Sequence, residues 1–508
     1  MSTPTPEQPS TLQAPTDTSA PTVRNALRSP KMLRTEVLAG LVVALALIPE
    51  AISFSIIAGV DPRLGLFASF TMAVSISFLG GRPAMISAAT GAIALVIAPV
   101  AREYGLDYFI ATVILAGIFQ VTLGALGVAK LMRFIPRSVM VGFVNALAIL
   151  ILMAQVPHIV DVPWLVYPLI GFGIAIMVLL PRLTKVVPAP LVAIVILTLV
   201  TVAVALAVPT VGDQGELPDS LPSLFFPDVP LNIETFKIIA PYALAMALVG
   251  LLESLLTAKL VDDITDTHSE KTREAWGQGV ANIITGFFGG MGGCAMIGQT
   301  LINVKVSGAR TRISTFLAGL FLLILVVGLG DIVAVIPMAA LVAVMIMVAV
   351  GTFDWHSVQR NTLRRMPKSE TTVMLSTVIV VVLTHNLAIG VVIGVLVAMV
   401  LFARRVAHLT DVQDVEHIDE DTHMYAVTGE LFFATSNDLY SQFDYVNAPK
   451  HVIIDLSGAH IWDASTVAAL DAIERKFESK GKKVAFIGLN AASAAMHERL
   501  SGHLGVGH

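Results

Sequence analysis

Long apolar stretches separated by short polar interruptions occupy the chain between about residues 35 and 406. Several of them, such as 191–208 and 316–329, contain no charged residue. A helix that crosses a bilayer needs about 20 mainly apolar residues, and this region is long enough for a dozen or more such helices. Helices on the surface of a soluble protein would show a polar face, which these stretches lack. The pattern therefore predicts a many-pass integral membrane protein.

The boundaries of these stretches predict fourteen membrane-spanning helices in a membrane domain over residues 31–408. An even number of crossings places both termini on the same side of the bilayer. The predicted spans are 35–57, 64–80, 86–101, 107–129, 138–156, 164–180, 189–208, 236–260, 274–289, 295–306, 312–329, 332–351, 372–386 and 387–406.

Positive charge gathers in every second loop between the predicted spans. The intervening loops contain only Arg63 and Arg102, and the 209–235 loop carries five acidic residues and no Lys or Arg. Because Lys and Arg concentrate in cytosolic loops, both termini are predicted to be cytosolic, in a multi-pass protein of the cell (inner) membrane. The charged residues of the basic loops are Arg24, Arg28, Lys31, Arg34, Arg82, Lys130, Arg133, Arg137, Arg182, Lys185, Lys271, Arg273, Arg310, Arg312, Arg360, Arg364, Arg365, Lys368, Arg404 and Arg405.

The spans divide into two halves of nearly equal length, about 35–208 and 236–406, with seven helices each. An odd number of helices per half inverts the second half relative to the first, which is the plan of many secondary transporters. In both halves the third span is short and follows a glycine pair, Gly80-Gly81 or Gly292-Gly293, and each pair is followed closely by Ala-Met-Ile. Short, glycine-interrupted spans at matching places indicate the helices that bind the substrate.

Both ends of the chain differ from the middle. Residues 1–30 are rich in Pro, Thr and Ser, which predicts a disordered cytosolic tail rather than a cleavable signal peptide. From about Asp411 strands alternate with helices, which predicts a small cytosolic α/β domain over 411–508. The expected strands are 424–433, 452–456 and 484–488, and the expected helices are 437–445, 465–477 and 491–500.

Composition limits the function further. Hydrophobic residues make up 55% of the chain and charged residues 14%, with a mean hydropathy of +0.80, whereas a soluble protein has about 25% charged residues. So few charges leave no binding face for nucleic acid, and the expected partners are the lipid bilayer and a small solute. Cys294 is the only cysteine, so no intrachain disulfide forms. The sequence contains no metal-ligand cluster, nucleotide-binding loop or nucleophile–base arrangement, and no enzymatic activity is expected.

A helix that begins inside the membrane points free N–H groups and the positive end of its dipole into the protein, where they attract an anion. Two such helix starts from opposite halves would form an anion site without a formal positive charge. The alternative is that the small residues only allow the helices to pack closely. The residues expected at these starts are Ser87, Ala88, Ala89, Thr90 and Gly91 in the first half and Met296, Ile297, Gly298, Gln299 and Thr300 in the second.

Two acidic residues lie inside predicted spans at equivalent places, Glu50 in the first span and Glu253 in the eighth. Because a carboxylate in the membrane costs a few kcal/mol, such residues usually serve an ion pathway or a proton relay. Thr257 lies one turn after Glu253 on the same helix face, so the two residues are candidates for holding Na⁺ or relaying H⁺. The alternative is that the acids are hydrogen-bonded into the helix packing, or that a span is displaced by a turn.

These segments resemble the sulfate permease (SulP) family of anion transporters, and its bacterial members in particular. The resemblance covers nearly everything after the N-terminal tail. It rests on PEAISFS through GVDPRLGL in residues 49–66, on LESLL in residues 252–256, and on GGMGG through QTLIN to SGARTR in residues 289–312. The C-terminal α/β unit resembles the STAS domain that this family carries.

The resemblance implies an all-helical membrane domain of two inverted seven-helix repeats. Spans 1–4 and 8–11 would form a core domain, and spans 5–7 and 12–14 a gate domain. It implies an anion between the third and tenth spans, where Phe54 would flank it and Gly298 and Gln299 would lie on the tenth-span side. The core would move against the gate during transport.

The chain departs from the family at two of these positions. Many relatives have Ser-Arg where this chain has Gly298-Gln299, and Gln where it has Glu50. The first departure removes a positive charge and the second adds a negative one, so both oppose binding of a lone anion. A co-transported cation would restore the balance, either H⁺ on Glu50 or Na⁺ near Glu253 and Thr257. We therefore expect a secondary active anion transporter, with H⁺-coupled symport as the leading hypothesis and no cofactor or resident metal.

One residue of the C-terminal domain is a candidate modification site. Soluble STAS proteins are phosphorylated at the position that matches Ser465. Ser is also a favoured helix N-cap, and we favour this structural explanation for Ser465.

The sequence leaves the substrate and the coupling ion open. Sulfate, bicarbonate and a dicarboxylate such as fumarate are all candidates, and Na⁺-coupled bicarbonate symport is the runner-up. A passive anion channel is a different class, which the two intramembrane acids argue against because a channel has little use for a titratable site. A membrane-anchored signalling module is a third interpretation. A homodimer and a cytosolic partner of the STAS domain are further expectations.

Overall fold

The computed structural model describes residues 22–130, 135–183, 188–407, 411–419 and 421–503. The chain separates into two compact units, Met1–Val395 and Leu396–His508. The first unit is helical and carries the apolar stretches, and the second contains the α/β domain. Each unit is described by itself below.

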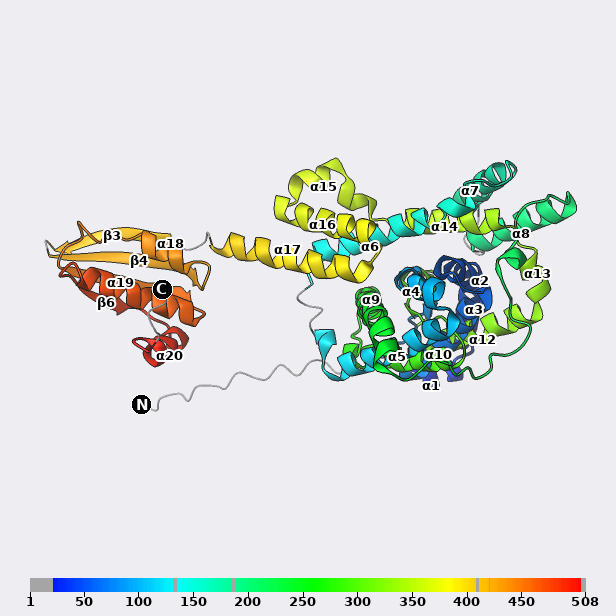
Figure 1. Ribbon diagram of the computed structural model, residues 1–508, viewed down its shortest axis with the longest axis horizontal. Helices are drawn as coiled ribbons and strands as arrows, with labels where there is room; N and C mark the ends of the chain where they lie inside the picture. The colour runs from blue at the N-terminus through cyan, green and yellow to red at the C-terminus, as the bar shows by residue number, and fades with distance from the viewer. Residues whose placement is uncertain (1–21, 131–134, 184–187, 408–410, 420, 504–508) are drawn as a thin grey trace. The chain divides into compact units, whose positions relative to one another are not determined.

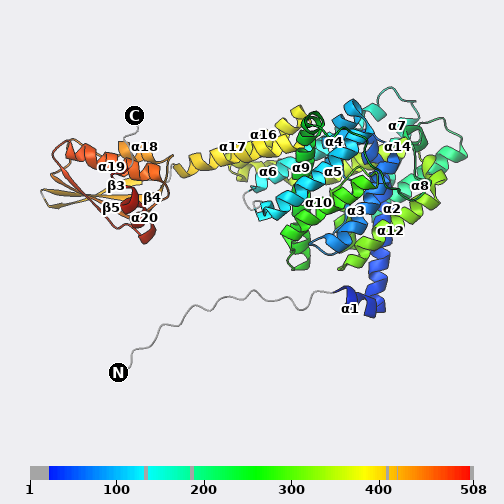
Figure 2. The same cartoon turned by 60° about the horizontal axis from the view of Figure 1, so that its bottom comes forward.

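Eight helices of the first unit pack closely on one another and are called the core group (Figures 1 and 2). They come from the first four and the eighth to eleventh predicted spans, as the resemblance to the SulP family implies for a core domain. Because the two sets lie in opposite halves of the sequence, the group is built from both repeats. Its members are α2 (Pro30–Ala58), α3 (Pro62–Leu79), α4 (Gly91–Tyr104), α5 (Leu106–Ala125), α9 (Ile233–Thr265), α10 (Lys271–Phe287), α11 (Ile297–Leu301, continued by a π-helical turn at Ile302–Val306) and α12 (Arg312–Gly328).

The remaining long helices form a second set, called the gate group, which lies above the core group in Figure 1. Glycines bring several of them into contact, because a methyl group at Gly142 would meet the Met374 carbonyl and one at Gly390 would overlap Val381. The group matches the predicted spans 5–7 and 12–14. Its members are α6 (Arg137–Met153), α7 (Val166–Leu183), α8 (Ala189–Ala203), α14 (Met338–Thr352), α16 (Lys368–Thr384) and the first part of α17 (Leu387–Ala407).

Every predicted span contains a helix, although several helices are too short to cross a bilayer alone. Within the described residues, seven helices are long and apolar enough to do so, and three apolar helices are shorter. The seven are Pro30–Ala58, Pro62–Leu79, Leu106–Ala125, Arg137–His158, Val166–Leu183, Ile233–Thr265 and Leu387–Val406. The number of crossings, fourteen, therefore stays a prediction.

Short helical turns lie in the connections between the long helices. The tail expected to be disordered over residues 1–30 is instead helical near its end, because Thr22 Oγ1 accepts a hydrogen bond from Asn25 N (3.2 Å) and caps a first helix. Residues 1–21 lie outside the described part of the chain. The short elements are α1 (Val23–Arg28), η2 (Val156–His158), η3 (Val211–Gln214), α13 (Gly330–Ala334), η5 (Trp355–Val358) and α15 (Arg360–Arg365).

The acidic loop between the two halves contacts both helix groups. On the gate side, Val211 N donates to Ile336 O at 2.9 Å, just before α14 begins. On the core side, Arg63 N donates to Glu216 O at 3.1 Å, and the Arg63 guanidinium pairs with the Glu216 carboxylate at 2.5 Å. Only a few residues therefore separate the loop's attachment to the gate group from its attachment to the core group.

The second unit has one four-stranded sheet in the order β3-β4-β5-β6, which confirms the predicted α/β class. β3 and β4 are antiparallel, whereas β5 runs parallel to both β4 and β6. β3 was not predicted, because an edge strand made mostly of charged and polar residues lacks the apolar alternation of a buried strand. The elements are β3 (Asp411–Asp419), β4 (Thr422–Leu431), α18 (Ser436–Ser441), β5 (His451–Ile461), α19 (Ala464–Glu478), β6 (Lys483–Ile487) and α20 (Ala491–Leu500).

Candidate functional site

Two short extended segments meet inside the core group, each just before one of the short helices. β1 (Ser87–Ala88) pairs antiparallel with β2 (Cys294–Ala295), with Ser87 opposite Ala295 and Ala88 opposite Cys294. α4 starts three residues after β1 and α11 two residues after β2. The two helix starts that the inverted repeat predicts therefore lie beside each other, one from each half.

The segment before β2 is fixed by buried amide side chains and by glycine. The Asn282 side chain accepts from Gly293 N (2.8 Å) and donates to Gly293 O (3.0 Å). Its amide also donates to Gln120 Oε1 at 2.8 Å. A side chain at Gly293 would collide with the Ala88 carbonyl. The second glycine pair of the sequence is therefore needed because two backbones cross here.

The Ala-Met-Ile repeat does not mark equivalent places in the two halves. In the first half it occupies residues 84–86 and ends before β1, whereas in the second it occupies residues 295–297 and overlaps β2 and the start of α11. The match is a coincidence of composition, and the β pairing gives the true correspondence.

A cavity of about 360 Å³ lies in front of these helix starts, between the core group and the gate group. The core group contributes one wall through α2, α4, α9 and α11, and the gate group contributes the other through α6 and α14. The lining residues are Glu50, Phe54, Thr90, Gly91, Ala92, Glu253, Met296, Ile297, Gly298 and Leu301 on the core side and Phe143, Val144, Leu147, Ile151, Val348, Gly351 and Thr352 on the gate side.

Half of the predicted site residues reach this cavity. The five that line it are Glu50, Phe54, Thr90, Glu253 and Gly298. The glycines at the two helix starts differ: a methyl group at Gly91 would lie 2.9 Å from the Phe54 ring, whereas the Cβ position of Gly298 has no described atom within 4 Å. Gly91 therefore lets Phe54 pack against the start of α4, and Gly298 leaves cavity space open.

The other predicted residues are placed behind the cavity wall. Ala88 and Ala89 were expected in the first helical turn, but they precede α4 in extended or irregular backbone, and Ala89 N donates to Ser69 Oγ at 3.3 Å. Thr300 Oγ1 accepts from Ile86 N at 3.0 Å. The Ala89 backbone and the Thr300 hydroxyl therefore hold the two crossing segments, and none of these three residues lines the cavity.

The Glu253 carboxylate is held by the only cysteine. Cys294 Sγ donates to Glu253 Oε2 at 2.9 Å, and Thr90 Oγ1 lies 3.1 Å from the same sulfur. Thr90 also caps α4 by accepting from Ile93 N at 3.4 Å. Thr257 does not join this group through its hydroxyl proton, because its Oγ1 donates to the Glu253 backbone carbonyl at 2.7 Å.

The Glu50 carboxylate has a different partner. The buried side chain of Gln299, on α11, lies next to the carboxyl group of Glu50 on α2. The amide oxygen of Gln299, Oε1, is buried and has no hydrogen-bond partner among the described residues. Gln299 therefore lies behind the residues that line the cavity, where it contacts Glu50 and does not itself line the cavity.

Two further buried acids, which were not predicted as site residues, have structural roles. Glu36 accepts hydrogen bonds from the backbone N–H groups of Arg310, Thr311 and Ser314, at 2.8, 3.0 and 3.1 Å. Glu274 accepts from Gly81 N at 2.7 Å, and from the next backbone N–H at 3.1 Å. Both carboxylates are used to hold backbone segments, so they are not free to serve a solute.

The gate-side wall was also missed, because its members are apolar residues within apolar spans. Only their position opposite the two helix starts distinguishes Phe143, Leu147 and Val348 from residues that face lipid or the helix packing. Cys294 was noted only as a lone thiol, and its contact with Glu253 depends on the pairing of β1 with β2.

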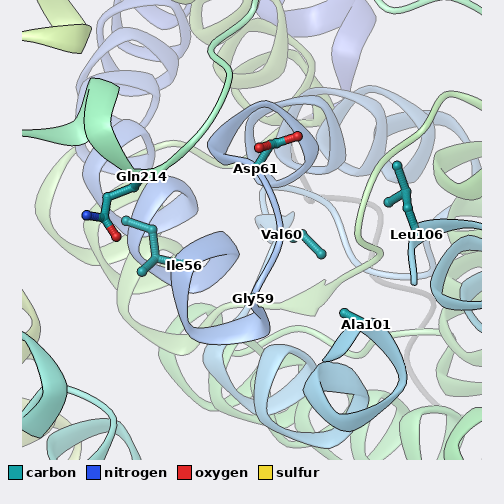
Figure 3. A pocket seen from close by; sticks show the side chains of 7 residues that line it. All are labelled: Ile56, Gly59, Val60, Asp61, Ala101, Leu106 and Gln214. Atoms are coloured by element: carbon teal, nitrogen blue, oxygen red, sulfur yellow. The ribbon is translucent and has the colours of Figure 1, made fainter. Parts of the chain in front are cut away.

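A second pocket, of about 380 Å³, lies where α2 and α4 end and the acidic loop passes (Figure 3). Its polar side chains are Asp61 and Gln214, and it contains none of the predicted site residues. Asp61 Oδ1 already accepts from Glu216 N at 3.2 Å. This pocket therefore belongs to the loop contacts and is separate from the carboxylates of the first cavity.

In the C-terminal domain the N-cap of α19 is Asp463 and not Ser465. Asp463 Oδ1 accepts from Thr466 N at 3.0 Å, and Ser465 lies exposed in the first turn. The structural explanation that we favoured for Ser465 is therefore wrong, because a different residue caps the helix.

The family model named "Sulfate permease family" matches residues 33–167 and 168–377, which is more than half of the chain. The chain belongs to the sulfate permease family. A STAS domain model matches residues 413–502. The protein is thus a multi-pass membrane protein of a transporter family with a C-terminal STAS domain, as the resemblance indicated.

Curated relatives cover almost the whole chain. It is 51% identical over 469 residues to the putative sulfate transporter YbaR of Bacillus subtilis (strain 168), which covers 92% of this chain and 97% of YbaR. It is 24% identical over 522 residues to the bicarbonate transporter BicA of Picosynechococcus, covering 92% of this chain and 91% of BicA.

Solved structures share the fold at low identity. The transmembrane domain of a cyanobacterial BicA superposes with a TM-score of 0.62 at 23% identity and covers 73% of this chain and 98% of that one. The inward-facing murine anion transporter Slc26a9 gives 0.78 at 16% identity and covers 92% and 87%. The membrane architecture is therefore that of this family.

Proposed function

We propose that the protein is a secondary active transporter that takes up a small inorganic or organic anion together with a cation, with H⁺ as the coupling ion. The observation that carries the proposal is the cavity between the two helix groups. It combines two helix starts, which attract an anion, with two carboxylates, which repel it, and no Lys, Arg or His is among its described lining residues.

The helix starts supply the attraction. Backbone N–H groups in the first turn of α4 are not all used within the helix, and they carry the positive end of its dipole. Gly298 on the α11 side leaves room for the solute to approach the backbone. An oxyanion of a few heavy atoms fits a space of about 360 Å³, and the Phe54 ring would flank it.

The carboxylates make anion binding depend on a cation. At a separation of about 5 Å and an effective dielectric constant of about 20, two like charges repel by roughly 3 kcal/mol. A proton or a bound cation on Glu50 or Glu253 removes this repulsion, so the anion and the cation bind better together than apart. Such mutual dependence is the thermodynamic condition for symport.

The two walls of the cavity belong to different helix groups, which is the arrangement that alternating access requires. The anion-attracting helix starts and both acids belong to the core group, whereas α6 and α14 belong to the gate group. A movement of the core group against the gate group would carry the complete site from one side of the membrane to the other, as transporters with inverted repeats do.

Three anions are candidates for the substrate. The name of YbaR supports sulfate and that of BicA supports bicarbonate, and a dicarboxylate such as fumarate fits the same charge logic. Na⁺-coupled bicarbonate symport is the alternative. It would place Na⁺ beside Glu253, where Thr257 could offer only a lone pair because its proton is used within the helix. A passive anion channel would not need either acid.

We also propose that both termini face the cytosol, with the STAS domain as a site of regulation that leaves transport to the membrane unit. Removing residues 411–508 would then alter the rate of uptake without abolishing it. Complete loss of transport by a stably inserted truncated protein would instead make the STAS domain essential.

Uptake into proteoliposomes tests the proposal. Sulfate, bicarbonate and fumarate are offered separately under an imposed inward H⁺ gradient, an inward Na⁺ gradient, or neither. We expect one of the anions to accumulate above its own equilibrium level when H⁺ is supplied. Glu370→Gln, on the exposed first turn of α16, is the matched acid control. Equilibration without accumulation under every gradient would show a channel and overturn the proposal.

A further inference from the structure

We propose that Glu50 and Gln299 form a second cation site, separate from Glu253, so that two monovalent cations accompany each anion. The inference rests on the proposed function and extends it from the presence of coupling to its stoichiometry. It is carried by an unpaired oxygen that lies behind the cavity wall, on the residue next to Glu50, and by the charges of the two acids that line the cavity.

The unpaired oxygen is Gln299 Oε1. Gln299 is only 2% exposed, its side chain lies next to the Glu50 carboxyl group, and its amide oxygen has no hydrogen-bond partner in the part of the chain that the structure describes. Leaving a buried acceptor unsatisfied is unfavourable. The carboxylate of Glu50 and this amide oxygen belong to different helices of opposite halves, and both are hard oxygen ligands of the kind that bind small cations.

The Glu253 carboxylate already accepts a hydrogen bond, and its partner is not an amide side chain. The carboxylate accepts from Cys294 Sγ at 2.9 Å, and that sulfur is in turn 3.1 Å from Thr90 Oγ1. Within the described residues, neither Glu50 nor Gln299 is hydrogen-bonded to Glu253, Cys294 or Thr90. The two acids therefore have separate surroundings, and each has its own place for a cation.

Charge balance then fixes the number of cations. Glu50 and Glu253 are the only titratable side chains among the described residues that line the cavity, and both are acids. With one cation bound, one negative charge still faces the anion. With two cations bound, the cavity wall is neutral, and no carboxylate charge opposes the attraction of the anion to the two helix starts. The complex that crosses the membrane should therefore contain one anion and two cations.

The bound cation can be a proton or a sodium ion, because the ligands suit both. A proton on Glu50 would be shared with Gln299 Oε1 once the amide turns its oxygen toward the carboxyl group. A sodium ion would be held by the carboxylate and Oε1 together. In either case one positive charge moves with Glu50 and Gln299.

The charge carried per anion tests the inference on the wild-type protein. Proteoliposomes are given a fixed anion gradient and a fixed cation gradient, and the membrane potential at which net anion flux stops is measured. Two cations per anion are expected. For a monovalent anion one net positive charge then moves per cycle and the flux stops at a defined potential, whereas for a divalent anion no net charge moves and the membrane potential does not change the flux. A ratio of one cation per anion would overturn the second site and leave the proposed symport intact.

Two variants assign the second cation to its ligands. In Glu50→Gln the charge per anion should become more negative by one elementary charge, and Gln299→Ala should weaken the dependence of uptake on the cation concentration. Glu370→Gln should retain the wild-type ratio. If Glu50→Gln transports with the wild-type ratio, the site is not at Glu50. If Glu50→Gln is inactive, Gln299→Ala decides the assignment, and an unchanged dependence of its uptake on cation concentration would overturn it.

The same vesicles distinguish the two cations. Flux in the absence of Na⁺ at a ratio of two identifies protons at both places. A requirement for Na⁺ together with a pH gradient identifies one of each. No gradient-driven uptake of any anion would instead contradict the proposed function itself, so that the two failures are distinguishable.

Discussion

Glu50 and Glu253 stand at equivalent places in the two halves of the chain and face the same cavity, yet they are held differently. Glu253 accepts from the thiol of Cys294, which connects it to the cap of α4. Glu50 meets an amide on α11 that keeps one oxygen free. Inverted symmetry therefore places two acids in one cavity, whereas the residues around β2 and α11 give each acid its own surroundings.

The largest effect should come from removing either charge. Glu253→Gln keeps the shape of the side chain but cannot take part in charge balance, and we expect cation-driven uptake to fall at least about tenfold, equivalent to ~1.4 kcal/mol. Glu50→Gln should retain more transport and show a weaker dependence on pH. Uptake is measured across pH in liposomes with equal amounts of protein. Unchanged pH dependence in Glu50→Gln would contradict proton coupling at this residue.

A smaller effect should separate the two helix starts. Gly91→Ala places a methyl group against the Phe54 ring, and overpacking of this kind costs roughly 1–3 kcal/mol of stability. Gly298→Ala adds a methyl group to open cavity space, so it should leave the unfolding temperature unchanged and weaken anion uptake a few-fold. Thermal unfolding in detergent and initial uptake rates test this pair. Equal loss of stability in both variants would place Gly298 in packing rather than in the cavity.

Cys294 should show a still smaller effect that depends on the replacement. Cys294→Ser keeps a donor for Glu253, whereas Cys294→Ala leaves the buried carboxylate without it, at a cost of about 1–3 kcal/mol. We expect near-normal uptake in the serine variant and a few-fold loss in the alanine variant. Identical behaviour of the two would mean that the thiol contact does not position Glu253.

The smallest effect should come from the acidic loop, because this loop contains neither of the two proposed coupling residues. Arg63 is half-buried and Glu216 is exposed, and an ion pair near the surface contributes only about 0.2–1 kcal/mol. Arg63→Gln should change the rate of uptake less than twofold, and salt should weaken the difference further. A complete loss of transport would show that the loop's attachment to the core group is essential.

Much of this arrangement was predictable from the sequence. Apolar stretches gave the helices, and the odd number of spans per half gave the inverted repeat that brings the starts of α4 and α11 together. Glu50 and Glu253 were recognisable because acids inside apolar spans are rare. Each of these inferences depends on local pattern or on symmetry.

The parts that could not be predicted depend on contacts between distant segments. The exact start of α4 is set by the pairing of β1 with β2, so Ala88 and Ala89 were placed one turn too far into the helix. The role of Thr300 as an acceptor for Ile86 N arises from the same crossing. The gate-side wall consists of ordinary apolar residues, whose identity contains no sign of the cavity that they face.

The central claim is that the anion passes through the cavity between the core group and the gate group. A cysteine at Gly298, in a Cys294→Ser background, tests it directly, because it would be the only thiol in the chain. The account predicts that a small charged thiol reagent blocks uptake of the transported anion, and that the anion together with its coupling cation slows the labelling. Labelling that neither blocks uptake nor responds to the anion would contradict the account.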